Sequence, residues 1–311
     1  MVEGQENVSW PQWLDLAAAC EETGLEGLFR SDHYLSVQGR GERGSLDAWA
    51  TLAGLAAATD RIRLGTLVSP VTFRHPSALA KTVVTCDHIS GGRVELGLGA
   101  GWHEDEHLAY GFPFPPQRER LEMLAEQAEI VHRQWTEDEV GFEGKHYSLR
   151  DLHTLPKPLQ DPHPNLIIGG QGGRRSLAIA ARWADEYNVF FASTKRCAEI
   201  KGRAQDAWRN EGRDPDTLAF SLMTACVVGS DRGSLEKRAR AAMDHAGSDG
   251  SVKAWLDDLR DAAVVGTPRE AIARLKEYEA AGVHRIMLQH QTHEDVDMVR
   301  LIGEEIAPSV A

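Results

Sequence analysis

The sequence predicts an α/β protein that folds as a (β/α)8 TIM barrel. Two observations support this prediction: apolar runs of strand length alternate with amphipathic helical runs, and seven such units follow one another without a linker of domain-boundary type. Parallel strands covered by helices produce this pattern, and 311 residues suit one barrel. We therefore expect a single barrel domain over residues 1–311, with an insertion at about 136–164.

The predicted helices and strands alternate along the chain, and the first helix has clear start and stop signals. The first predicted helix runs from Trp10 to Thr23, with Ser9 as its N-cap, Pro11 in its first turn and Gly24 after its end. The other predicted helices are Leu46 to Thr59, Pro76 to Ile89, Arg118 to Trp135, a run from Arg174, Lys195 to Glu211, Leu235 to Ala246 and Arg269 to Ala281. The predicted strands are Leu25 to Arg30, Ile62 to Val68, Val94 to Leu98, Leu166 to Ile168, Tyr187 to Phe191, Leu218 to Val228 and Arg285 to Gln289.

The eighth strand should be the first in the chain, ahead of Trp10. Only nine residues are available there, and Met1-Val2-Glu3-Gly4 is a poor strand sequence. We therefore expect the first strand of the barrel to be truncated or missing.

The composition is that of a soluble globular enzyme, with 42% apolar and 26% charged residues. A net charge of −13 argues against nucleic acid or an anionic membrane as partner, because both would be repelled. The sequence has no secretory signal and no apolar run near the roughly 20 residues of a membrane span, so we expect a cytoplasmic location. The cysteines have no metal-binding spacing, which predicts buried free thiols at Cys20, Cys86, Cys197 and Cys226.

In a barrel the active site lies at the mouth formed by the C-terminal ends of the strands. The residues that follow the strands are rich in glycine, include one well-placed histidine and hold no paired carboxylates. This set favours a large cofactor bound by main chain over metal-assisted or glycosidase chemistry. Its members are Ser31-Asp32-His33, Val68-Ser69-Pro70, Gly99-Ala100-Gly101-Trp102-His103, Gly170-Gln171-Gly172-Gly173 and Asn188.

Two glycine-rich turns could present the backbone to a ligand. Glycines at the end of Val94 to Leu98 suit a flat or phosphorylated ligand, or only a tight turn. A Rossmann fingerprint is excluded there, because Trp102 occupies its third glycine position. Gly169 to Gly173 opens a helix at Arg174 and Arg175, which suits a phosphate group, or a structural turn with solvated arginines.

Histidines provide the candidates for acid–base or metal chemistry. His33 could act as general acid or base, or serve as a structural loop residue, and Asp32 beside it could be a turn or cap residue. The segment from His103 to His107 meets His-Glu-x-x-His literally. It follows glycines and lacks a third ligand motif, so an acidic first helical turn is the better interpretation.

Several further segments occur in a characteristic order. They are Gly24 to His33, Arg61 to Val68, Arg74 to Pro76, Asp87 to Arg93, Gly97 to Trp102, Gly169-Gly170 and Ala184 to Glu186. At these spacings the chain resembles the luciferase-like monooxygenase superfamily, in particular its coenzyme F420-dependent oxidoreductase branch.

The resemblance implies a (β/α)8 barrel, often a homodimer, with the deazaflavin ring at the barrel mouth. It implies a bulge and a non-prolyl cis peptide in the strand carrying Leu67-Val68, and it makes His33 a proton donor or acceptor beside the reactive carbon. Trp102 would flank the substrate pocket. The cofactor-binding set implied for this chain is Asp32, Leu67, Val68, Gly99, Ala100, Gly101, Gly170, Gln171 and Gly172, with the last three at the phosphate end.

The family motifs do not separate users of F420 from users of FMN. The sequence therefore predicts an F420-dependent hydride transfer with a small organic substrate, and leaves two alternatives: an FMN-dependent monooxygenase, and a non-catalytic barrel that binds cofactor or nothing. The substrate depends on the loops around Trp102, Gln38 to Ser45 and Thr136 to Pro164.

Overall fold

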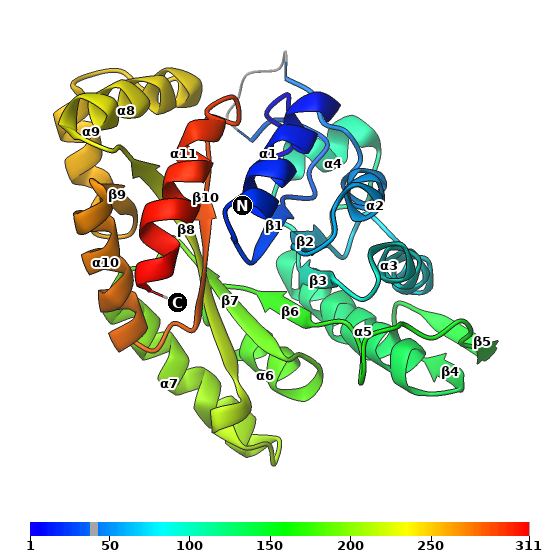
Figure 1. The fold of residues 1–311 in the computed structure, drawn as a ribbon. Helices are drawn as coiled ribbons and strands as arrows, with labels where there is room; N and C mark the ends of the chain where they lie inside the picture. The colour runs from blue at the N-terminus through cyan, green and yellow to red at the C-terminus, as the bar shows by residue number, and fades with distance from the viewer. Residues whose placement is uncertain (38–42, 311) are drawn as a thin grey trace.

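A computed structural model describes residues 1–37 and 43–310. Most of the predicted loop Gln38 to Ser45 (residues 38–42) lies outside the described residues. Figure 1 shows a curled sheet with helices around its outer face. The strands pair in parallel in the order β1-β2-β3-β6-β7-β8-β10. Their bounds are Gly27–Arg30, Arg63–Pro70, Val94–Gly99, Leu166–Gly169, Glu186–Phe190, Ala219–Val228 and Arg285–Gln289.

The main helices lie close to the predicted ranges and follow their strands along the chain. At the first of them, Ser9 and Gln12 form a capping box, and proline occupies the first turn. The helices are α1 (Trp10–Glu22), α2 (Ala48–Ala58), α3 (Pro76–Ser90), α5 (Gln117–Thr136), α6 (Arg174–Trp183), α7 (Thr194–Asn210), α8 (Arg232–Ala246) and α10 (Pro268–Ala280).

Several shorter elements were not predicted. The hairpin β4 (Glu139–Glu143) and β5 (Ser148–His153) lies within the predicted insertion, at the edge of the molecule beside α5 (Figure 1). Most of its residues are exposed or half-buried, so it lacks a strong apolar alternation. The other short elements are the 3₁₀ turn Pro215–Thr217, α9 (Val252–Leu259), β9 (Val264–Gly266), α11 (Val296–Leu301), the π turn Ile302–Ile306 and the 3₁₀ turn Ala307–Ser309. The short helix α4 (Glu104–Tyr110) begins at the acidic turn that the sequence indicated.

The first strand is truncated, as predicted. Val2 forms parallel bridges to Arg30, the last residue of β1, and to His290, just after β10. These two strands are the ends of the curled sheet. This one residue occupies the position of the missing strand. The described chain is therefore a (β/α)8 barrel that closes through a single residue near its mouth.

The barrel interior is layered. An apolar layer contains Phe29, Leu67, Ile167 and Met287. A charged layer lies toward the N-terminal ends of the strands and includes the ion pair of Arg285 with Glu95 at 2.7 Å. The larger hydrophobic core fills the space between the sheet and the helices. The apolar layer therefore separates the charged end of the barrel from its mouth.

Strand β2 has the irregular backbone that the family resemblance implied. A cis peptide joins Leu67 to Val68, and the pairing of β2 with β3 shifts register between Thr66 and Ser69. Both features are confirmed. The side chain of Val68 lies against Gly99 and Gly169 at the ends of the neighbouring strands.

Two expectations from composition can be compared with the structure. The four cysteines are buried and free, which confirms their prediction as buried thiols. Among residues 1–37 and 43–310, the helices are too short or too polar to cross a membrane.

Candidate active site

The candidate site is centred on His33, which follows β1 at the mouth of the barrel. Its Nδ1 lies 2.8 Å from Oε2 of Glu106 on α4, and its side chain is 14% exposed. Because a carboxylate only accepts, Nδ1 carries the proton in this hydrogen bond. The other ring nitrogen, Nε2, is then the one that can exchange a proton with a bound molecule.

Glu106 is fully buried, and three donors surround its carboxylate. Oε2 accepts from His33, while Oε1 accepts from the backbone amides of Tyr34 and Leu35, the latter at 3.0 Å. This arrangement ties the loop after β1 to α4, although more than 70 residues separate them in sequence. Glu106 was missed by sequence analysis, which assigned it only to an acidic first turn.

The two groups shift each other's pKa. Burial by itself would lower the pKa of His33, but the hydrogen bond and the negative charge of Glu106 outweigh it, so that the pKa is raised. Burial by itself would raise the pKa of Glu106, but His33 and the two amides outweigh it and lower that pKa. The pair therefore favours an ionised carboxylate beside a readily protonated imidazole.

Aromatic rings surround the histidine on its exposed side. Trp102 lies edge-on to His33 with a centroid distance of 5.7 Å, and it stacks on His103 at 5.1 Å. The Trp102 side chain is 63% exposed, which is unusual for a residue of this size. An exposed indole next to the imidazole fits the predicted position at the substrate pocket.

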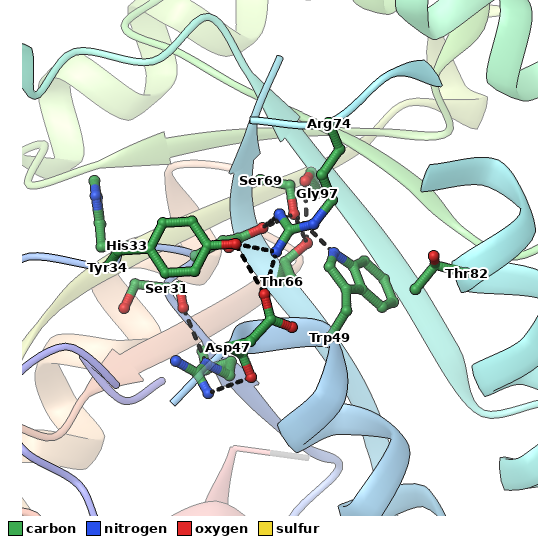
Figure 2. Close-up of polar contacts among 12 residues, drawn as sticks. Ser31, His33, Tyr34, Asp47, Trp49, Thr66, Ser69, Arg74, Thr82 and Gly97 are labelled. Carbon is green, nitrogen blue, oxygen red and sulfur yellow. Dashed lines mark hydrogen bonds and ion pairs between the residues drawn. The ribbon is translucent and has the colours of Figure 1, made fainter. Parts of the chain in front are cut away.

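Asp32 belongs to a buried polar network behind His33. Its Oδ2 accepts from Ser69 Oγ at 2.6 Å and from Arg74, which also pairs with Asp47 at 2.8 Å. Figure 2 shows Arg74, Tyr34 and Asp47 meeting in this network, with the imidazole of His33 directed away from it.

The second carboxylate oxygen of Asp32, Oδ1, is buried and has no hydrogen-bond partner within the described structure. A buried acceptor without a donor is costly, and it is satisfied when a bound molecule offers an N–H or O–H group. A ligand that donates an N–H or O–H group to this oxygen would satisfy it.

The strand-end glycines have a structural reason that sequence analysis did not identify. A Cβ on Gly99 would lie 2.5 Å from a methyl of Val68, and one on Gly169 would lie 2.9 Å from the other methyl. A Cβ on Gly97 would collide first with the backbone oxygen of Thr66 and would lie 3.0 Å from a methyl of Val68. The glycines thus make room for Val68, and Val68 itself, which is half-buried, forms part of the surface at the mouth.

In the turn from Gly99 to Gly101, which was predicted to contact the cofactor, one backbone group already has a hydrogen-bond partner within the protein. The carbonyl oxygen of Ala100 accepts from Arg120 Nε at 3.2 Å. Gly101 has a positive φ of 76°, which favours glycine whether or not a ligand is bound. Leu67 is buried in the apolar layer of the barrel, beneath the mouth.

The predicted phosphate end lies at the start of α6. The Gly172 amide donates to Tyr187 Oη at 2.9 Å, and a Cβ on Gly170 would lie 2.5 Å from that hydroxyl. Gly173 is the N-cap and offers no side chain to the helix amides, while Arg174 and Arg175 are exposed. Uncapped amides beside two cations fit an anionic group.

The His103 to His107 segment forms the start of α4 instead of a metal site. His107 donates from Nδ1 to the His103 carbonyl oxygen at 2.7 Å, and its Nε2 accepts from Thr72 at 2.6 Å. Glu106 points to His33. The described residues contain no group of three or more potential ligands that could hold a metal ion.

The structure brings most of the predicted residues to one end of the barrel. His33 follows β1, Val68 lies near the end of β2, and Gly99 and Gly169 end β3 and β6, which are adjacent in the sheet. The contact of Val68 with both glycines joins three of these strands directly.

Comparisons with known proteins agree with this arrangement. A family model described as luciferase-like monooxygenase matches residues 2–285. An uncharacterized protein of Mycobacterium tuberculosis is 36% identical over 183 residues, which are 57% of this chain and 62% of that protein. The chain thus matches less than two thirds of that relative's length.

Two other relatives match over longer spans. The F420-dependent glucose-6-phosphate dehydrogenase of Nakamurella multipartita is 31% identical over 313 residues, covering 94% of this chain and 91% of the enzyme. The FMNH2-dependent dimethylsulfone monooxygenase of Pseudomonas putida is 26% identical over 300 residues, covering 88% of this chain and 80% of that enzyme. Among solved structures, the monooxygenase RslO1 from Streptomyces bottropensis superimposes with a TM-score of 0.82 at 26% identity, covering 97% of this chain and 94% of that one.

Proposed function

Because the chain belongs to the luciferase-like monooxygenase family, we propose that it is an oxidoreductase that uses coenzyme F420 to exchange a hydride with a small organic substrate. An F420-dependent dehydrogenase is its relative at 31% identity over 94% of the chain. The observation that carries the proposal is the pair of His33 and Glu106 at the barrel mouth, which supplies the proton chemistry that must accompany hydride transfer.

His33 is the proposed acid–base residue. When a substrate is oxidised it loses a hydride and a proton, and Nε2 of His33 accepts the proton. When a substrate is reduced, the same nitrogen gives the proton back. Glu106 holds Nδ1 in its protonated form and stabilises the imidazolium.

The remaining residues of the mouth would hold the cofactor. When bound, coenzyme F420 supplies a ring carbon that accepts or gives a hydride. Asp32 Oδ1 would accept a hydrogen bond from the polar edge of the ring, Val68 would support its apolar face, and Trp102 would border the substrate. Backbone from Gly99 to Gly101 would contact the cofactor, and Gly170 to Gly172 with the start of α6 would meet its phosphate.

An FMN-dependent monooxygenase is the second candidate. It is favoured by the 26% identity with the FMNH2-dependent enzyme over 88% of this chain. The two functions differ in chemistry, because reduced FMN activates oxygen whereas the deazaflavin reacts with it poorly.

Direct binding distinguishes the candidates. The purified protein is titrated separately with coenzyme F420 and with FMN, and the change in cofactor fluorescence is followed in each titration. We expect saturable binding of F420. Binding of FMN alone would contradict the proposal and support the monooxygenase, and binding of neither would support a non-catalytic barrel.

A further inference from the structure

Glu3 places a carboxylate inside the barrel at its mouth. Successive residues of an extended strand point to opposite faces of the sheet. Met1 packs against the apolar layer inside the barrel, and Val2 packs into the core between the sheet and the helices. The side chain of Glu3 therefore points inward again, one step nearer the mouth than Met1.

Gln289 at the end of β10 confirms this direction. Met287 lies in the apolar layer, whereas Leu288 packs against the core on the helix side, so Gln289 faces the interior. Its Nε2 donates to Oε1 of Glu3 at 2.6 Å. Gln5 Nε2 donates to Oε2 of Glu3 at 2.7 Å. Two buried glutamine amides therefore hold the carboxylate in place.

The charge of Glu3 has no counterion in contact with it. Within the part of the chain that the structure describes, this carboxylate forms no ion pair, and its side-chain partners are the two neutral amides. The guanidinium of Arg30 lies within electrostatic range. It is bound elsewhere, because it donates to Thr51 Oγ1 at 2.7 Å and to the Leu46 carbonyl oxygen at 2.9 Å. Glu3 is only half-buried, so a molecule in the mouth can reach it.

Gln291 adds a second acceptor next to this carboxylate. Its Nε2 donates to Oε1 of Gln289 at 3.4 Å. Its own Oε1 is buried and has no hydrogen-bond partner among the described residues. Glu3, Gln289 and Gln291 thus form a row that holds a carboxylate and an unpaired amide oxygen. An ammonium group suits such a row, because it offers three N–H donors and a positive charge.

The imidazole of His33 is near enough to act on the same ligand. Burial lowers the pKa of His33 and Glu106 raises it, and the negative charge of Glu3 raises it further. Glu3 and His33 therefore lie within electrostatic range of each other at one mouth. The net charge of −13 also favours the approach of a cation over that of an anion.

We propose that Glu3, with Gln289 and Gln291, forms a substrate subsite for a positively charged amino group, so that the substrate is an amino alcohol. This proposal rests on the hydride transfer proposed above. The alcohol carbon gives its hydride to oxidised F420, and the hydroxyl proton passes to Nε2 of His33, which leaves an amino ketone. A phosphorylated sugar, as in the name of the Nakamurella multipartita relative, would meet a like charge at Glu3.

Three alcohols of similar size and different charge test the subsite: 1-amino-2-propanol, 1,2-propanediol and lactate. Each is titrated into ¹⁵N-labelled protein, and the side-chain amide signals of Gln289 and Gln291 are followed by NMR. These signals are assigned by their absence in Gln289→Leu and Gln291→Leu. We expect both to shift saturably with the amino alcohol, with an affinity at least about tenfold higher than that of the diol, and to stay unmoved with lactate. This readout needs no cofactor.

Substitution of Glu3 provides the second readout. In Glu3→Gln, which keeps the size and removes the charge, the affinity for the amino alcohol should fall to that for the diol. Glu3→Asp keeps the charge and should keep the preference. Glu139→Gln, on the exposed hairpin, is the control. With F420 present, kcat/KM for the three alcohols should follow the same order.

The outcomes separate the subsite from the proposed function. Equal binding of the amino alcohol and the diol, or a preference that persists in Glu3→Gln, would overturn the subsite even when F420 binds. A preference for the amino alcohol that depends on Glu3, in a protein that does not bind F420, would support the subsite and contradict the hydride transfer.

Discussion

His33 and Glu106 illustrate how a single buried contact can set the chemistry of this site. The histidine alone is a loop residue with a near-neutral pKa, which could have many roles. The carboxylate fixes which nitrogen carries the proton and raises the pKa of the imidazole. It also accepts hydrogen bonds from the backbone amides of Tyr34 and Leu35, so one side chain orients both the imidazole and the loop that carries it.

Replacing His33 with alanine tests the acid–base role. We expect kcat to fall by roughly 100-fold or more, the usual contribution of a positioned acid or base, with an unchanged circular dichroism spectrum, because His33 lies in a loop. The assay follows F420 absorbance with the best substrate from a panel of small alcohols and aldehydes. His153→Ala, on an exposed hairpin residue, is the control. Unchanged turnover in His33→Ala would remove the assigned role.

Glu106→Gln tests the positioning role. The amide can still accept from Tyr34 and Leu35, but it lacks the charge that raises the pKa of His33. We expect the pKa of His33, measured by NMR of its ring protons against pH, to fall in the variant, and the pH–rate profile to move in the same direction. Asp105→Asn, exposed on the same helix, should leave both unchanged. A His33 titration unaffected by Glu106→Gln would contradict the coupling.

The pair should also give the folding free energy a pH dependence. The pKa of Glu106 is lowered in the folded protein. Its contribution to stability is therefore present above the pKa of an unfolded glutamate, about 4.3, and is lost as the pH falls through the pKa of the folded state. The pKa of His33 is raised in the folded protein. Its contribution to stability is therefore present below the pKa of an unfolded histidine, about 6.5, and is lost as the pH rises through the pKa of the folded state.

We therefore expect Glu106→Gln to lower the free energy of unfolding most between about pH 4.3 and pH 6.5. Urea unfolding at several pH values measures this loss. A stability loss of equal size from pH 3 to pH 9, roughly the span around these reference values, would show that the loss is not electrostatic.

Sequence could identify the position of His33 but not the role of its partner. His33 and Asp32 follow a predicted strand, and barrel geometry alone sends such residues to the mouth. Glu106 lies in a short helix more than 70 residues away, within a run of acidic residues that resembles an ordinary first turn. Only the folded arrangement of α4 over the loop after β1 brings it to the imidazole.

At the scale of elements, the ends of β2, β3 and β6 pack through one side chain. Val68 occupies the space that side chains at Gly99 and Gly169 would otherwise need. Sequence analysis associated the strand-end glycines with a ligand, because it had no means to see which neighbour approached them. The bulge in β2 decides this contact, and it depends on pairing between strands about 30 residues apart.

Gly99→Ala should therefore destabilise the protein by about 1–3 kcal/mol, as overpacking in a core does. In the double variant with Val68→Ala, part of this loss should be recovered, because the colliding methyl is gone. Urea unfolding of the unsubstituted protein, the two single variants and the double variant gives the interaction energy between positions 68 and 99. Gly202→Ala, in α7 with open space around it, is the control and should be neutral or slightly stabilising. Additive effects would contradict the contact.

The long elements could be predicted because their signals are local. Capping residues, proline at helix starts and apolar periodicity located α1, α3 and the strands of the barrel within a few residues. The hairpin β4–β5 and the short helices α4 and α9 have few buried residues, and packing against other parts of the chain decides them.

At the scale of the whole molecule, the strand order places the chemistry. Parallel strands send every C-terminal end to one mouth, so loops far apart in sequence meet there. The apolar layer of Phe29, Leu67 and Met287 separates that mouth from the charged end of the barrel. The mouth thus combines the imidazole of His33, the unpaired carboxylate oxygen of Asp32 and the exposed indole of Trp102.

The most direct test of the central claim follows the imidazole of His33 while cofactor is added. Protein labelled with ¹⁵N in histidine is titrated with coenzyme F420, and the His33 ring signals are assigned by their absence in His33→Ala. The account predicts that these signals shift in step with F420 binding, while those of His153 on the distant hairpin do not. Saturable F420 binding with unmoved His33 signals would contradict a cofactor site at this mouth.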